Sequence, residues 1–299
     1  MKKTKIIIPA LGVMLLSTAA SVTGTVAWFS MNSFVNATEM RVQAKAENGI
    51  VISNSSAENA SWTDTATALH NTALALFPTS TLDSTTWCHS NSNNQDSHNT
   101  GNPYRMISPV VDATTGAGYL NTNGQEGYQK DKAGNVEADE AYYLLNSFYI
   151  KSSADQITKT LYVNSVTVTG NSSSPDLDKA LRVLVALHGS EETTAKVFSP
   201  VTGGATSYQS CVAVTEDNPE TTETNEYAAT KEAVTSVAAG TKNTAFLADQ
   251  VIPARSASPL QIDIYLYFEG EDPACKSTNL TGTLDTLQVA VQFGTTTIA

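Results

Sequence analysis

Two short stretches of this 299-residue chain contain side chains of the types that bind metal ions. The acidic stretch "FEGEDPAC" places Glu269, Glu271 and Asp272 in one turn after an apolar run, and calcium prefers carboxylate oxygens. The spacing is not that of an EF-hand loop, so we expect a solvated turn, with calcium binding as the alternative. The stretch "DKAGNVEADE" is a second, weaker candidate of the same kind.

A polar stretch further upstream contains softer ligands. Cys88, His89 and His98 fall within one predicted loop, but their spacing does not match a four-ligand zinc site. The sequence also lacks the H-E-x-x-H motif of zinc proteases and the G-x-S-x-G motif of serine hydrolases. We therefore predict a protein without catalytic residues and, apart from the calcium alternative, without a cofactor.

Tryptophan and cysteine residues leave other functions open. Trp62 and Trp87 could stack on a glycan, although aromatic side chains in strand-rich chains are more commonly part of a core or an interface. The three cysteines, Cys88, Cys211 and Cys275, allow three disulfide pairings with one thiol left over, and the sequence does not choose among them.

The charge and the alternation of side chains define the class of protein. A net charge of −12 argues against nucleic-acid binding, which requires a basic surface. In "MRVQAKA" apolar and polar residues alternate with the period of a half-buried strand. Further strands are predicted in "AYYLLNSFYIK", "TLYVNSVTVTG", "ALRVLVALHG", "QSCVAV", "LQIDIYLYF" and "LQVAVQF".

Two local features complete the predicted elements. At "ENGIVIS" a three-residue hairpin loop would pair Ala46 with Ile50, and it requires Gly49 in the left-handed region. Helical spacing between Glu226 and Gly240 predicts one short helix. Residues 78–139, rich in Ser, Asn, Asp and Gly, are predicted to form a loop-rich insertion. Together these patterns predict an all-β protein, an antiparallel β-sandwich with long loop insertions and one short helix.

The N-terminus has the order of a secretory signal peptide. Three lysines precede the apolar run Ile6–Leu16, and the small residues Thr25 and Ala27 stand where a signal peptidase requires them. We expect cleavage between Ala27 and Trp28, so that residues 1–27 are the leader and residues 28–299 a single secreted domain without a membrane segment. The alternative is a retained anchor, because the apolar stretch reaches the roughly 20 residues that span a bilayer.

The leader resembles the SipW-type signal peptides of Gram-positive bacteria, which precede proteins of the TasA and camelysin family. The matching residues are Gly24, Thr25, Ala27, Trp28, Phe29 and Ser30, whereas Met31 and Asn32 replace the usual acidic residue. The stretch "EGEDPAC" and the strand endings resemble clostridial surface proteins with the same type of leader. The resemblance implies a jelly-roll-like β-sandwich and a secreted subunit of an extracellular surface fibre or biofilm matrix.

In that family the segment after the cleavage site can complete the sheet of a neighbouring subunit. The resemblance thus implies a donor strand within residues 28–39, with Asn36–Glu39 as a link and Met40–Ile52 as a resident hairpin. The assembly residues would be Trp28, Phe29, Met31, Phe34 and Val35. The alternative is that this segment folds onto its own sandwich. As alternatives to the fibre, the protein would be a surface adhesin or sugar-binding module that contacts its ligand through residues 78–139, or a viral jelly-roll coat subunit.

Overall fold

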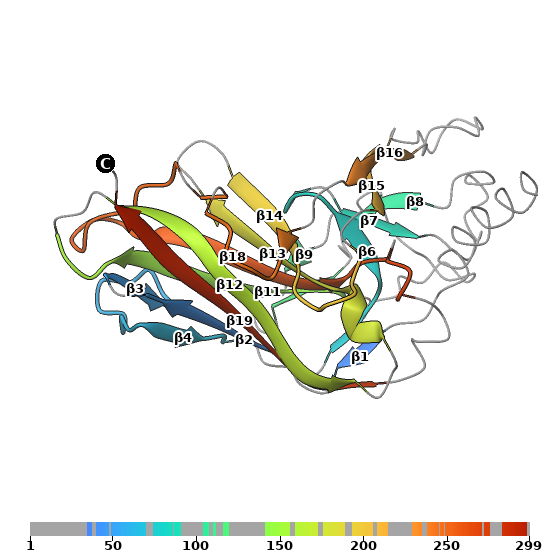
Figure 1. Ribbon diagram of the computed structural model, residues 1–299, viewed down its shortest axis with the longest axis horizontal. Helices are drawn as coiled ribbons and strands as arrows, with labels where there is room; N and C mark the ends of the chain where they lie inside the picture. The colour runs from blue at the N-terminus through green and yellow to red at the C-terminus, as the bar shows by residue number, and fades with distance from the viewer. Residues whose placement is uncertain are drawn as a thin grey trace, which may run out of the picture.

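The structure, a computed structural model, confirms the predicted all-β, sandwich-like fold (Figure 1). The residues described are 35–37, 40–47, 49–69, 74–85, 87–90, 104–107, 110–111, 116–119, 141–155, 159–172, 176–188, 193–205, 208–214, 229–234, 238–244, 246–247, 249–270, 272–275 and 283–297. Within these ranges the one helix is a 3₁₀ turn, Leu177–Ala180, and none has the length and hydropathy needed to span a membrane.

The first layer of the sandwich is built around two long central strands. From one edge to the other, its strands are β17 (Ala238–Ala239), β14 (Thr193–Ser199), β13 (Leu181–His188), β18 (Leu260–Phe268), β11 (Ala141–Ser152) and β3 (Ile50–Ser53). Seven of the eight side chains of β13 are buried, as are the first four of β11, whichever face they point to. From Leu145 onward, alternate side chains of β11 are only partly buried. The odd and even positions of a strand point to opposite faces of the sheet, and here both are apolar because both faces are covered by other parts of the protein.

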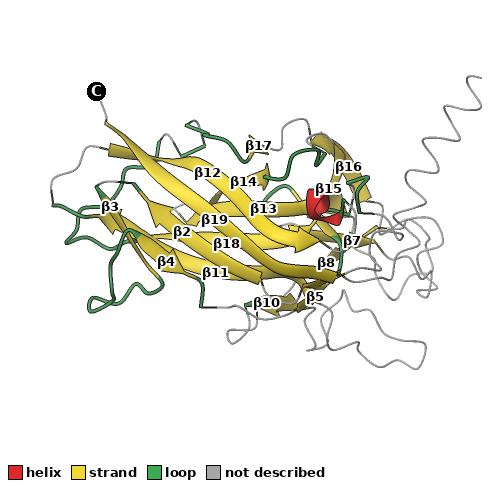
Figure 2. Cartoon of the chain, turned by 60° about the horizontal axis from the view of Figure 1, so that its bottom comes forward, coloured by secondary structure: helices red, strands yellow, loops and turns green. Residues whose placement is uncertain are grey.

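The second layer is organised by the C-terminal strand. Its strands, in order, are β12 (Lys159–Ser172), β19 (Thr283–Thr297), β2 (Met40–Ala46) and β4 (Thr65–Thr67). β19 is antiparallel to β12 and parallel to β2, and Figure 2 shows β12 and β19 side by side. On β2 the side chains of Met40, Val42 and Ala44 are fully buried, which confirms the strand predicted from alternation.

Two short strands join the layers at one end. β1 (Val35–Ala37) pairs in parallel with the start of β19 and antiparallel with β5 (Leu74–Leu76), and β5 in turn pairs with β11. The main core lies between the two layers and contains Phe148 of β11 and Phe293 of β19, neither of which is accessible to solvent. Burial of such a side chain contributes about 1.5–3 kcal/mol, so this core is the main source of stability.

The turn after β2 differs from the predicted hairpin. Gly49 has φ +100°, as the sequence predicts, and the N–H of Ile50 donates to the carbonyl of Glu47 at 3.3 Å. However, β2 pairs with β19 and β3 pairs with β11, so the predicted pairing of Ala46 with Ile50 is wrong. The chain crosses from one layer to the other here, which buries the apolar residues of both strands in the same core.

Residues 78–139 contribute more than surface loops. The described part contains β6 (Thr79–Thr81), β7 (Trp87–Ser90) and β8 (Tyr104–Ile107), which form a three-stranded sheet, and the short strands β9 (Val110–Val111) and β10 (Ala117–Tyr119). Trp87 is 2% exposed and packs with tyrosines on the outer face of the first layer. Because Trp87 covers the outer face of the first layer, the apolar side chains on that face are buried. A solvated loop in its place would leave them exposed to water.

The helix predicted between Glu226 and Gly240 is wrong. Ala229–Val234 form strand β16, which pairs antiparallel with β15 (Tyr208–Val214), and Ala238–Ala239 form β17. Apolar residues at helical spacing in a short segment are also compatible with a strand, and here the backbone hydrogen bonds to β15 decide between the two.

Candidate functional site

The acidic turn after β18 is not solvated. Glu269 is inaccessible to solvent and Asp272 is 3% exposed, so the prediction of a solvated turn is wrong for both. A buried carboxylate needs a compensating charge or hydrogen bonds. Asp272 receives both from Arg182 on β13, whose guanidinium is also fully buried.

The hydrogen bonds around this ion pair connect three segments. Arg182 donates through Nη1 to the carbonyl of Lys179 at 2.7 Å and through Nη2 to that of Ala205 at 2.8 Å. Asp272 accepts from the N–H of Ala205 and from that of Ala274, each at 2.8 Å. The pair therefore fastens the 3₁₀ turn, the loop after β14 and the acidic turn to one another.

This arrangement gives Asp272 partners within the protein. Both of its oxygens accept hydrogen bonds from the protein. Glu271 lies outside the described residues, as does His98, and the described part of the chain contains no group of three potential metal ligands. Cys88 lies on β7 and Cys211 on β15, while Cys275 is a buried free thiol. Burial, with a smaller effect of the Glu269 carboxylate, raises the pKa of the Cys275 thiol, so this thiol is protonated at neutral pH.

A second polar cluster lies on the outer face of the first layer, around Asp263 of β18. This carboxylate is 4% exposed, accepts a hydrogen bond from the hydroxyl of Ser147 at 2.6 Å, and lies 2.7 Å from Nε2 of His188. The three residue types are those of a serine hydrolase, but the serine donates to the aspartate and not to the histidine. The cluster therefore does not activate Ser147 as a nucleophile.

The aromatic cluster on the same face is a packing feature. The rings of Trp87 and Tyr143 lie 4.5 Å apart, and Tyr265 packs edge-on against Tyr143 at 5.1 Å. Burial, and to a smaller extent the Asp263 carboxylate, raises the pKa of Tyr143 to about 12. Trp87 is thus a core residue and is not available to stack on a glycan.

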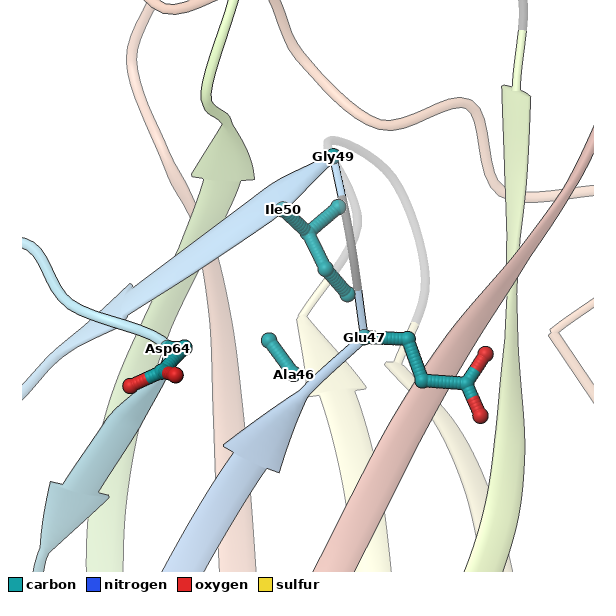
Figure 3. Close-up of a pocket in the computed structure, with 5 residues that line it drawn as sticks. All are labelled: Ala46, Glu47, Gly49, Ile50 and Asp64. Carbon is teal, nitrogen blue, oxygen red and sulfur yellow. The ribbon is translucent and has the colours of Figure 1, made fainter.

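The pocket beside the β2–β3 turn contains two carboxylates that do not face each other. It has a volume of about 430 Å³ and is lined by Ala46, Glu47, Gly49, Ile50 and Asp64. Figure 3 shows the carboxylates of Glu47 and Asp64 pointing in opposite directions, and the first is within 3.3 Å of the Tyr162 hydroxyl. The two acids therefore cannot share a cation across this pocket.

A larger groove lies on the outer side of β3 and β11. Its volume is about 600 Å³, within the usual range of ligand sites, and Trp62 is partly exposed in its wall. The ammonium of Lys151 lies 4.0 Å from the centre of the indole ring. Of the two tryptophans that could stack on a glycan according to the sequence, Trp62 is therefore the one that is accessible to a ligand.

Of the five predicted assembly residues, the structure describes Val35. Val35, predicted to be an assembly residue, belongs to β1 and pairs with Leu76 of β5 in its own chain. Asn36 and Ala37, predicted to be part of a short link, continue this strand. Trp28, Phe29, Met31 and Phe34 lie outside the described residues, as does the expected cleavage site between Ala27 and Trp28.

The feature that sequence reasoning missed is a part of the outer edge of β12 that no described residue covers. Along its outer edge β12 is covered by the 240–252 segment, for example where the N–H of Val166 donates to the carbonyl of Gly240 at 3.0 Å. From Thr167 to Ser172 no described residue bonds to that edge. Strand pairing at long range is not encoded in local alternation, so no sequence signal marks this edge.

Comparison with known proteins gives no relative: no family model, no curated protein and no solved structure matches this chain.

Proposed function

We propose that this protein is a secreted structural subunit whose copies join into an extracellular filament by strand addition. Residues Trp28–Phe34 of one copy pair with the open edge of β12 in the next. The observation that carries the proposal is this edge, which is unpaired in the described structure over Thr167–Ser172. Open edges are hazards that proteins cover, and a strand from a neighbour covers them with main-chain hydrogen bonds.

The backbone direction at this edge fits such an acceptor. Val166 donates outward, to Gly240, and successive residues of a strand alternate in the direction of their N–H groups. The N–H and C=O of Val168 therefore point outward as well. Six residues of strand extend over about 20 Å, a length that the seven residues Trp28–Phe34 can match.

The position of β1 favours a neighbour over the same chain as the donor. β1 and the last residues of β12 flank the start of β19 on opposite sides, because Ala37 and Ser172 both pair with Leu284. β1 is parallel to the start of β19, so Val35, which directly follows Trp28–Phe34 in the sequence, lies at this end of the sandwich. A neighbour placed at this end can accept that segment without a reversal of the chain.

The composition of the proposed donor supports burial in a groove. Trp28, Phe29, Met31 and Phe34 are large apolar residues directly after the expected cleavage site. Burial of each such side chain contributes about 1.5–3 kcal/mol, which can exceed the cost of ordering the strand. The leader sequence supports secretion of this subunit.

The test compares two substitutions at one acceptor residue. Val168→Pro removes the outward N–H without removing a bond to β19, whereas Val168→Ala keeps the N–H and loses only side-chain packing against the core. Both are made in a chain that begins at Trp28. We expect filaments by electron microscopy for the parent and for Val168→Ala, and soluble monomers for Val168→Pro.

Deletion of Trp28–Phe34 tests the donor in the same assay. The shortened chain retains β1 and should be a folded monomer that no longer assembles. Filaments from this chain, or from a folded Val168→Pro variant, would show that the contacts lie elsewhere. Unfolding of the shortened chain would show that the segment belongs to its own sandwich, which also contradicts the proposal.

A further inference from the structure

We propose that the groove beside Trp62 binds a saccharide that carries a carboxylate, with the sugar ring against the indole and the acid group at Lys151 and Arg255. The groove lies on the outer side of β3 and β11. The open edge of β12 belongs to the other layer, so this inference is independent of the proposed assembly.

Both walls of the groove are held by hydrogen bonds within the protein. On one side the N–H of Ala60 donates to Ala57 at 3.0 Å, and Thr63 pairs with Ile52 of β3, which fixes the loop that contains Trp62. On the other side the N–H of Ser256 donates to the carboxylate of Asp155 at 3.0 Å. The groove is thus largely preformed, which lowers the entropy cost of binding.

The aromatic wall suits a sugar ring. Trp62 is partly exposed and lines the groove, and the electron-rich face of an indole attracts the polarised C–H groups of a pyranose. One contact of the ring, with the Lys151 ammonium at 4.0 Å, is already made within the protein. A ligand that touches the ring is therefore within reach of a cation.

The charged side chains of the groove are not paired with one another. Lys151 and Arg255 line it together with Glu58 and Asp155, yet among the described residues none of these four forms an ion pair within 4.0 Å. The side chain of Arg255 is exposed and donates one long hydrogen bond, to the carbonyl of Ser153 at 3.4 Å. Its guanidinium is free to bind a carboxylate through two parallel hydrogen bonds.

The remaining lining favours a saccharide over other anions. Carboxylates and hydroxyls line the rest of the groove and can accept or exchange hydrogen bonds with sugar hydroxyls, through Glu58, Asp155, Ser153 and Ser256. Apart from Trp62, the apolar lining is limited to Val51 and Ala60, which offers little to the side chains of a peptide. A chain of net charge −12 is a poor partner for nucleic acid.

The test uses trigalacturonate as the acidic probe and galactotriose as its uncharged counterpart. Binding to the full-length purified chain is measured by isothermal titration calorimetry and by tryptophan fluorescence. We expect trigalacturonate to bind at least about tenfold more tightly, and its affinity to fall as salt is raised. Arg255→Gln should weaken trigalacturonate binding about tenfold and leave galactotriose unchanged, whereas Trp62→Ala should weaken both.

Controls separate this site from general electrostatic attraction. Lys45→Gln, a substitution of an exposed lysine on β2 in the other layer, should change neither affinity. Arg255 is exposed, so Arg255→Gln should keep the circular dichroism spectrum of the parent even if Trp62→Ala does not. The proposal is overturned by equal binding of the two probes, by an unchanged affinity in Arg255→Gln, or by no binding up to about 10 mM. Tighter binding of an aspartate-rich peptide would also overturn it.

Discussion

Arg182 on β13 and Asp272, 90 residues later in the turn after β18, form an ion pair in which neither side chain reaches solvent. Removal of one partner from a buried pair leaves an uncompensated charge, which costs about 3–5 kcal/mol. We therefore expect Asp272→Asn to lower the free energy of unfolding by that amount, as measured by urea denaturation.

The control for this prediction is the exposed pair between Lys179 and Asp176. Asp176→Asn removes a charge of the same kind but from a solvated side chain, and asparagine tolerates the left-handed backbone at this position, where φ is 70°. The midpoint of unfolding should stay unchanged. A similar loss in both variants would indicate that burial does not set the strength of the Arg182–Asp272 pair.

Trp87→Ala should destabilise the whole sandwich, because Trp87 is 2% exposed and contacts the rings of Tyr143, Tyr265 and Tyr267. Substitution of a buried tryptophan by alanine typically costs about 3–5 kcal/mol. Thermal unfolding measures the change, with Leu69→Ala as the control, since Leu69 is 72% exposed. If Trp87→Ala leaves the melting temperature unchanged, the sheet β6–β7–β8 does not pack on the first layer.

The stability of the protein should fall between about pH 10 and pH 12. The pKa of Tyr143 is raised to about 12 by burial, and that of an unfolded tyrosine is about 10. In this interval the unfolded chain has lost the phenolic proton that the folded chain retains, so the folded state is penalised by about 2.7 kcal/mol. Chemical denaturation across this range measures the loss. Tyr143→Phe should reduce the slope, and an identical slope in that variant would contradict the assignment.

Gly49→Ala should destabilise the turn between β2 and β3 by about 1–2 kcal/mol, because residues with a Cβ rarely adopt φ +100°. A Cβ at this position would also come within 3.2 Å of Nζ of Lys159, the flexible end of a side chain. The double variant Gly49→Ala with Lys159→Ala should therefore remain destabilised relative to Lys159→Ala alone. Full recovery in the double variant would show that the contact, and not the backbone, is responsible.

The strands of this protein could be predicted from the sequence because alternation is a local property. In β2 the buried residues Met40, Val42 and Ala44 alternate with Arg41, Gln43 and Lys45. Burial of one face of the strand is enough to produce this pattern, whichever strands pair with it. The positive φ of Gly49 was likewise predictable, since it depends on the turn itself. The segment Ala229–Val234 was not, because its short apolar pattern fits a helix and a strand equally.

Only the tertiary structure decided which strands pair and which polar residues meet. The sequence places β2 next to β3, but β2 pairs with β19, from the other end of the chain. The acidic residue Asp272 is typical of a solvated turn until Arg182 is brought to it by the pairing of β13 with β18. The accessibility of Trp62 and the burial of Trp87 were undecided for the same reason. Local residue patterns determine the form of each strand, whereas partners distant in sequence are selected by the burial of the whole core.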